Sequence, residues 1–314
     1  MLRHDNDFYG KLSADSIRLH LLVLFRMARP PQILLIGFVY LFGAVVGWAT
    51  GQANDAESFW LGLLILIPGS MSVHYANEYA DYETDLRTKR TLYSGGSGAL
   101  PESGLPRRLA LIAAWVSLFV VVGLAFLGLW ARMLHPMGMT VLFVGVFFGW
   151  MYSLPPFALA WRGWGEITNA LLGAMLLPQY GYAVQAGRLD LRLALVYLPF
   201  VALAFNNLLA TTWADRRADA AVGKYTMATR WSPRNLQKLY TAVALGAFLS
   251  LLAIRSWLLP PVVFWFSLFA FPAVLWGALT YTQKRNPLPS VSAMVLMLTF
   301  QLIAWGFTAL KFPL

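Results

Sequence analysis

The sequence predicts an all-α integral membrane protein with nine transmembrane helices around a central cavity. Its composition is strongly apolar: 59% of the residues are hydrophobic, 12% are charged and the mean hydropathy is +0.60. Soluble domains carry about 25% charged residues. The apolar residues form many stretches of about 20 residues, which is the length that an α-helix needs to cross a bilayer. These stretches do not alternate in polarity as the strands of a membrane barrel do.

The expected spans follow the apolar runs in chain order. We place them at about residues 32–50, 59–77, 108–130, 136–152, 166–185, 192–213, 237–254, 258–280 and 291–311. Ahead of them, Ser13 to Ala28 has the pattern of an amphipathic helix that rests in the membrane interface. We expect a single membrane-embedded domain over residues 1–314, in which residues 1–31 form a cytoplasmic or interfacial N-terminal helix.

The basic residues orient these spans. Of the 24 Lys and Arg, 19 precede the first span or fall in every second loop, which leaves five for the other loops and the C-terminus. Cytoplasmic loops carry the excess of Lys and Arg in membrane proteins. We therefore expect a protein of the cell (inner or cytoplasmic) membrane with a cytoplasmic N-terminus. The net charge of +10 then reflects loops that face anionic lipid, and we expect no nucleic-acid partner.

An unusual acidic stretch, residues 77–85, stands at the end of an apolar run and contains four carboxylates. On a helix, Asn77, Asp81 and Asp85 share one face within an arc of roughly 80°. Carboxylates four residues apart lie about 5–6 Å from one another and repel by about 3 kcal/mol at an effective dielectric near 20. A cation relieves this repulsion. Oxygen ligands without Cys or His suit Mg²⁺, which usually shares its shell with substrate phosphates.

A second acidic stretch has the same spacing. Asp215 and Asp219 end the apolar run 193–214, on the same predicted side of the membrane as the first stretch. If both helix ends face one cavity, the chain has a two-sided acidic site that holds more than one Mg²⁺ around a diphosphate. Intramembrane carboxylates also mark ion paths, so an ion-coupled transporter is the alternative class. The gathering of the acids at one membrane face favours the diphosphate site.

The two stretches resemble the paired motifs of a known family. Asn77, Asp81 and Asp85 match the NDxxDxxxD motif of the UbiA superfamily of intramembrane prenyltransferases, with Glu78 in place of the usual first Asp. Asp215 with Asp219 resembles the second motif of that family, DxxxD. The resemblance covers nearly the whole chain and implies the UbiA-type fold with its nine helices.

Further segments resemble one branch of this superfamily, the 1,4-dihydroxy-2-naphthoate polyprenyltransferases (MenA). They are the glycine-rich residues 95–101, Tyr152 together with residues 162–166, and residues 219–226. Asn207 and its neighbour Asn206 are also similar to that branch, although they lie further upstream of the second motif than expected. Some relatives have a lysine four residues after the tyrosine, whereas this chain has Pro156. That departure agrees with the naphthoate branch.

The resemblance implies a role for each of these positions. Two Mg²⁺ ions would be held by Asn77, Asp81, Asp85, Asp215 and Asp219. The catalytic residues would be the same four aspartates, Asp81, Asp85, Asp215 and Asp219, with Tyr152. The substrate-binding residues would be Asn77, Arg87, Lys89, Arg162, Asn207, Arg216 and Lys224. From the residues alone, each basic side chain is either a phosphate contact or an ordinary charge of a cytoplasmic loop. The glycine-rich run is either a phosphate-binding loop or a flexible linker.

The reaction that the resemblance implies is Mg²⁺-dependent transfer of a polyprenyl group from an allylic polyprenyl diphosphate to an aromatic acceptor. The acceptor would be 1,4-dihydroxy-2-naphthoate, which places the enzyme in menaquinone biosynthesis, and a carbocation-like carbon would form on the donor. The lipid bilayer and the two substrates are the expected partners, without an obligatory protein partner. Hydroxybenzoate, homogentisate or a glycerol phosphate as acceptor, and terpene cyclisation, remain alternatives, and neither prenyl length nor oligomeric state follows from the sequence.

Overall fold

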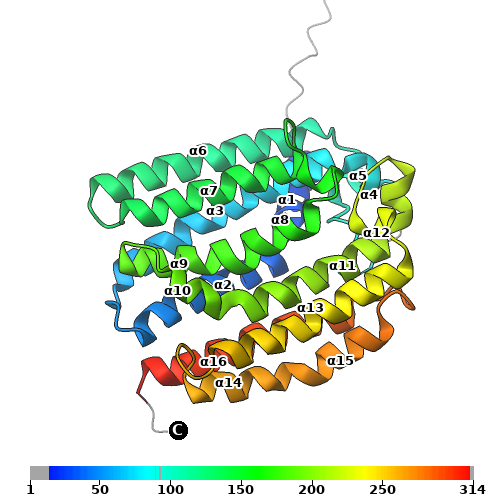
Figure 1. Ribbon diagram of the computed structural model, residues 1–314. Coiled ribbons are helices and arrows are strands. Elements are labelled where there is room, and N and C mark those ends of the chain that lie inside the picture. Colours follow the sequence, from blue (N-terminus) through cyan, green and yellow to red (C-terminus); the bar gives the residue numbers. More distant parts are fainter. Residues whose placement is uncertain (1–13, 89, 92, 312–314) are drawn as a thin grey trace, which may run out of the picture.

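The computed structural model describes residues 14–88, 90–91 and 93–311, and this part of the chain folds as a bundle of helices without a named strand (Figure 1). The prediction of an all-α membrane protein is confirmed. Eight helical stretches are long and apolar enough to cross a bilayer, judged by length and composition. They are α2 (Pro30–Ala49), α3 (Ala56–Ala80), α6 (Arg108–Trp130), α7 (Pro136–Ser153), α10–α11 (Leu191–Ala221), α13 (Pro233–Ile254), α14–α15 (Pro261–Thr280) and α16 (Leu288–Ala309).

The remaining expected span, at 166–185, is an interrupted helix. It consists of α8 (Gly165–Leu171), a π-helical turn η2 (Leu172–Leu176) and α9 (Leu177–Ala186). Polar residues such as Asn169, Gln179 and Gln185 lower its hydropathy, and Pro178 at the start of α9 cannot donate a backbone hydrogen bond. The expected nine spans are thus matched, among the described residues, by eight continuous stretches and this interrupted one.

Two of the long stretches are also composite. The sixth span begins as α10 (Leu191–Ala194), passes a 3₁₀ turn η3 (Leu195–Tyr197) and continues as α11 (Leu198–Ala221). The eighth consists of α14 (Pro261–Ser267), η4 (Leu268–Ala270) and α15 (Phe271–Thr280). A proline follows each 3₁₀ turn at the second position of the next helix, where its missing N–H costs nothing.

The N-terminal helix α1 (Ala14–Met27) agrees with the expected amphipathic segment. Val23 and Met27 are buried against the bundle, whereas Leu21 and Phe25 are exposed, as an interfacial helix requires. The chain then turns at Arg29, whose φ of 55° is left-handed, and two prolines start α2. This turn sets the direction in which α1 leaves the bundle.

Helices α2 and α9 pack with their backbones almost in contact. A Cβ on Gly43 would lie 1.7 Å from a carbonyl oxygen of α9, and a Cβ on Gly181 would lie 2.1 Å from one of α2. Small residues allow such close packing between membrane helices. Two large hydrophobic clusters meet at this pair: one includes α3, α6 and α7, and the other includes α11, α13 and α16.

Four short helical segments gather at one end of the bundle, where α3 and α11 also end (Figure 1). They are α4 (Tyr82–Asp85), α5 (Ala99–Ser103), the 3₁₀ turn η1 (Leu159–Trp161) and α12 (Met227–Arg230). The last described residues, after α16, lie at the opposite end (Figure 1). Both acidic stretches of the sequence therefore belong to the same end of the molecule.

Candidate functional site

The first acidic stretch keeps its helical register although α3 ends at Ala80. The backbone N–H of Asp81 donates to Asn77 O at 2.9 Å, and that of Asp85 donates to Asp81 O at 2.8 Å. The Asn77 side-chain amide also donates to Asp81 Oδ2 at 2.8 Å. The geometry thus agrees with the predicted shared face, and Asp81 and Asp85 are both buried.

The second acidic stretch reaches the first through Lys224. After α11 the chain turns at Gly223 (φ 76°), and the backbone N–H of Lys224 donates back to Asp219 O at 2.9 Å. The Lys224 ammonium lies 2.9 Å from Asp81 Oδ1 and 3.8 Å from Asp219 Oδ1. One buried cation therefore contacts both motifs. The two helix ends face one polar site, as the sequence suggested.

A strap of residues 95–98 crosses between the two motifs. The N–H of Gly95 donates to Asp215 Oδ2 at 3.1 Å, while Ser97 bonds to Glu78. Gly96 has φ 63° and lies so close to Asp85 that a Cβ would stand 2.1 Å from Asp85 Oδ2. The glycine run is therefore not a free linker, because the N–H groups of Gly95 and Ser97 bind carboxylates of the chain.

The charges in this site are crowded and largely dry. Burial, followed by the nearby carboxylates of Glu78 and Asp81, raises the pKa of Asp85 to about 7. Burial alone would lower the pKa of Lys224, but the carboxylates of Asp81 and Asp219 outweigh it and raise that pKa. Lys224 is thus charged at neutral pH, whereas Asp85 shares its site with a proton unless another cation binds.

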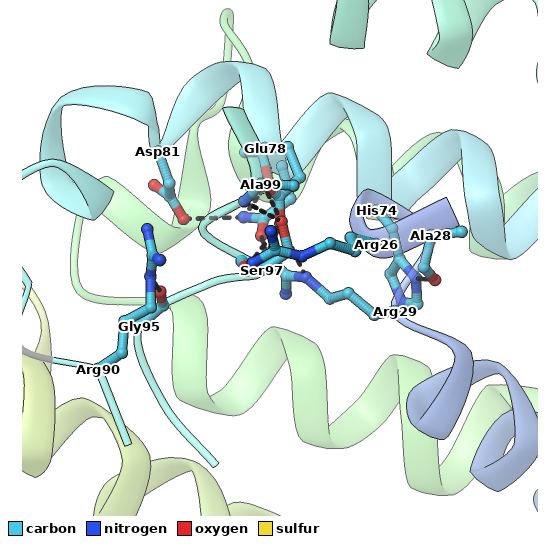
Figure 2. A network of polar contacts seen from close by, with 12 residues as sticks. Arg26, Ala28, Arg29, His74, Glu78, Asp81, Arg90, Gly95, Ser97 and Ala99 are labelled. Carbon is cyan, nitrogen blue, oxygen red and sulfur yellow. Dashed lines mark hydrogen bonds and ion pairs between the residues drawn. The ribbon is translucent and has the colours of Figure 1, made fainter. Parts of the chain in front are cut away.

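Glu78 is the site residue whose contacts the sequence analysis did not anticipate. Helical phase predicts that it points away from the face of Asn77 and Asp81, yet one nitrogen of Arg29 bonds both Glu78 Oε1 and Asn77 Oδ1, and Glu78 is 1% exposed. It forms an ion pair with Arg29 at 2.6 Å and accepts from Ser97, so α2, α3 and the strap meet at this side chain (Figure 2). A carboxylate at the end of an apolar helix, with an arginine before the Pro30–Pro31 pair, was the only available signal.

Other expected residues lie around this centre with different contacts. Arg87 donates to Ala221 O at 3.1 Å and ties α4 to the end of α11. Tyr152, at the end of α7, stands within electrostatic reach of Lys224. Arg162 is placed by its backbone, which pairs in parallel with Tyr225.

Arg216 and Asn206 contact Trp213 and Tyr240 rather than the acidic motifs. The guanidinium of Arg216 stacks 3.6 Å from the ring of Trp213. Asn206 donates to Tyr240 O at 3.0 Å in α13, whereas the buried Oδ1 of Asn207 has no partner among the described residues. Lys89 lies outside the described residues.

Glu166, at the start of α8, is a further buried carboxylate near Lys224. Its Oε1 accepts from the backbone N–H of Met227 at 2.9 Å and from Thr212 Oγ1 at 3.2 Å. Its Oε2 is buried without a hydrogen-bond partner in the described part of the chain. In the sequence, Glu166 stands out only as the last residue of the segment 162–166 that resembles the naphthoate branch.

The donor set fits Mg²⁺ that is completed by a phosphate ligand. Oδ1 of Asp215 and Oδ1 of Asp219 are buried and have no hydrogen-bond partner within the described ranges. Asp215 Oδ1 is therefore available to a cation, and Asp219 Oδ1 faces the Lys224 ammonium at 3.8 Å without a hydrogen bond. No group of three or more His, Cys, Asp or Glu in those ranges encloses a metal by itself. Mg²⁺ commonly takes one or two carboxylates and fills its shell with water and substrate phosphates.

Comparisons with known proteins agree with this geometry. A sequence model of the UbiA prenyltransferase family matches residues 36–303. No curated protein matches the chain. Among solved structures, a UbiA homolog from Archaeoglobus fulgidus bound to DMAPP and Mg²⁺ is similar, with 18% identity and a TM-score of 0.64 over 92% of this chain and 99% of that one.

Two further structures share the fold. A UbiA homolog from Aeropyrum pernix K1 is 13% identical, with a TM-score of 0.65 over 89% of this chain and 98% of the other. A digeranylgeranylglyceryl phosphate synthase is 11% identical, with a TM-score of 0.61 over 93% and 99%. At these identities the likeness shows the fold alone.

Proposed function

Because the chain belongs to the UbiA prenyltransferase family, we propose that it transfers a polyprenyl group from an allylic diphosphate to 1,4-dihydroxy-2-naphthoate. The observation that carries this proposal is the contact of Lys224 with both Asp81 and Asp219, because it brings the two acidic motifs to one site. The chain is therefore an enzyme, and the transporter alternative is set aside.

The acidic residues are proposed to hold two Mg²⁺ ions on the donor diphosphate. The first motif would supply Asn77, Asp81 and Asp85, and the second would supply Asp215 and Asp219. Bound Mg²⁺ neutralises the negative charge that develops on the leaving diphosphate. The A. fulgidus homolog, which was solved with DMAPP and with GPP together with Mg²⁺, supports this assignment.

The basic residues are proposed to bind the non-bridging phosphate oxygens. Lys224 is the best placed, because it already lies between the two motifs and keeps its charge. Arg87 and Arg162 stand at the same end of the bundle and suit bidentate phosphate contacts. When the allylic C–O bond breaks, its electron pair leaves with the diphosphate oxygen and a carbocation-like carbon remains, which the aromatic walls would keep from water. Trp161, whose ring centroid is 5.7 Å from Lys224 Nζ, and Tyr152 belong to these walls.

The acceptor is assigned from the three segments that resemble the naphthoate branch. In the strap, Ser97 binds Glu78 and Gly95 binds Asp215, which gives this segment a specific place in the site. With the naphthoate, a new carbon–carbon bond forms at the carbon that bears the carboxylate, and CO₂ leaves. We place the enzyme in the cytoplasmic membrane, with its N-terminus and the acidic end in the cytoplasm, on the basis of the loop charges.

A reconstituted assay tests the proposal. Purified protein is incubated with labelled polyprenyl diphosphates and a panel of acceptors, with Mg²⁺ or with EDTA. We expect a prenylated naphthoquinol and CO₂ with Mg²⁺ only. Asp81→Ala and Asp215→Ala should abolish turnover while the protein stays folded, and Glu83→Gln, at an exposed position of α4, is the matched control.

Two results would contradict different parts of this assignment. Normal turnover by Asp81→Ala or Asp215→Ala would refute the diphosphate site. Prenylation of another phenol, or cyclisation of the donor alone, would refute the acceptor and leave the metal site in place.

A further inference from the structure

We propose that Glu78 is a positioning residue of the transferase reaction, because it holds the strap of residues 95–98 and thereby orients Asp215 of the opposite motif. The proposal rests on the proposed diphosphate site, and it assigns to Glu78 a task distinct from metal ligation. Glu78 follows Asn77 in the sequence, and its side chain lies beside Ser97 of the strap and Arg29 (Figure 2).

The first step is the anchor of the strap. Glu78 Oε1 accepts from the backbone N–H of Ser97 at 3.0 Å, and Oε2 accepts from Ser97 Oγ at 2.8 Å. Hydrogen bonds to an ionised group are stronger than neutral ones. Because Glu78 is buried, water does not compete for these contacts. One carboxylate thus fixes both the backbone and the side chain of Ser97.

The second step connects the strap to Asp215 of the second acidic motif. Gly95 is two residues from Ser97, and its N–H donates to Asp215 Oδ2 at 3.1 Å. The other oxygen of Asp215 is the buried Oδ1 without a partner, which is available to a cation. Gly95 of the strap, together with the neighbouring Ser94 side chain that also bonds Asp215, therefore leaves Oδ1 as the free oxygen of Asp215. Between these contacts, Gly96 lies against Asp85, where no side chain fits.

The third step is the charge balance of Glu78. Arg29 donates to Glu78 Oε1 through Nη2 at 2.6 Å and Nε at 3.0 Å, and its Nη2 also reaches Asn77 Oδ1 at 3.0 Å. The arginine thus connects the turn between α1 and α2 to the anchor. On the far side, Arg90 Nε donates to Gly95 O at 3.1 Å and its guanidinium fills the space beside Gly98.

A purely structural role for Glu78 makes a different prediction from a positioning role. If the carboxylate only stabilises the fold, its loss lowers the melting temperature and the amount of active protein, while the remaining protein binds metal and donor normally. If it positions the strap, folded protein binds the metal–diphosphate unit more weakly. The acceptor constant would be unaffected in the second case, because the hydrogen bonds of Gly95 and Ser97 given above join the strap to residues of the two acidic motifs, which are proposed to bind the donor.

The experiment compares four variants of the full-length protein in detergent. Ser97→Ala removes one bond to Glu78 and leaves the Arg29 ion pair, so it keeps the fold. Glu78→Gln removes the charge, and Glu78→Asp keeps the charge on a shorter side chain. Glu83→Gln makes the same change of charge at an exposed position on α4 and is the control.

Three readouts are taken: Mn²⁺ binding with inorganic pyrophosphate by electron paramagnetic resonance, trypsin cleavage after Arg90, and the Michaelis constants of both substrates. For Ser97→Ala we expect about tenfold weaker Mn²⁺–pyrophosphate binding, the size of one lost hydrogen bond to a charged group. The donor KM of Ser97→Ala rises by a similar factor, whereas its acceptor KM and its melting temperature match those of the Glu83→Gln control. Trypsin cleaves Ser97→Ala after Arg90 faster than it cleaves the control. Glu78→Gln shows a larger loss, which Glu78→Asp partly restores.

Control-like Mn²⁺–pyrophosphate binding and cleavage in both Ser97→Ala and Glu78→Gln would overturn the proposal. So would a loss that only follows the fraction of unfolded protein. If the wild type prenylates no acceptor but the strap variants still bind Mn²⁺–pyrophosphate more weakly than the control, the proposed function fails and the positioning role of Glu78 stands.

Discussion

The stability of the protein without metal should fall as the pH rises from about 4 to 7, because of Asp85. Burial and the neighbouring carboxylates raise its pKa to about 7 in the folded state, whereas an unfolded Asp has a pKa of about 3.9. A carboxyl with the higher pKa in the folded chain binds its proton more tightly there. Its stabilising effect is therefore complete below pH ~4 and is lost as the pH passes 7. The difference corresponds to about 4 kcal/mol.

The measurement is the melting temperature of wild type and Asp85→Asn in detergent with EDTA, between pH 5 and 8. The wild type should lose stability over this window, and the variant, which mimics the protonated side chain, should lose less. At pH 8, Mg²⁺ should restore more stability to the wild type than to the variant, because the cation replaces the proton. Equal pH profiles for the two proteins, or a wild type that becomes more stable toward pH 8 in EDTA, would refute the reasoning.

Three further substitutions test separate features of the structure. Lys224→Met removes the buried cation between the motifs and should cost about 3–5 kcal/mol without Mg²⁺; chemical unfolding in EDTA measures this, and an unchanged midpoint contradicts it. Gly96→Ala places a Cβ 2.1 Å from Asp85 Oδ2 at a left-handed φ of 63°, so the melting temperature should fall and the Mg²⁺ concentration for half-maximal activity should rise severalfold. Gly43→Ala places a Cβ 1.7 Å from the backbone of α9 and should destabilise by about 3 kcal/mol, whereas Gly123→Ala, with open space around it, should be neutral or stabilising.

Much of the fold follows from local features of the sequence. Apolar length predicts the spans, and the boundaries agree to within a few residues, as at α6 and α7. The exception is the span at 166–185, where the sequence indicates an ordinary helix but the structure has a π-helical turn before Pro178. Such a turn depends on how neighbouring helices pack, and this information is not contained in a hydropathy pattern.

The residue types of the site could be predicted from the sequence, but most of the contacts between its residues could not. The spacing of Asp81 and Asp85 gives their common face, because helical phase is a local property. That Lys224 bridges the two motifs depends on contacts across 143 positions of the chain. The burial of Glu78 was also not predictable, because a single glutamate at a helix end is usually solvated and only the folded chain brings Arg29 to it.

Helices α2 and α9 pack against each other and form a wall between the two hydrophobic clusters. Each cluster includes side chains of both helices. Phe42 and Val46 of α2 face one cluster, while Tyr40 and Ala44 face the other. Both helices precede residue 187, so an N-terminal fragment that ends there carries the complete wall with one side uncovered, and the C-terminal fragment has no surface on which to assemble. We expect such fragments to be insoluble alone in detergent and to recover a folded enzyme only when they are co-expressed.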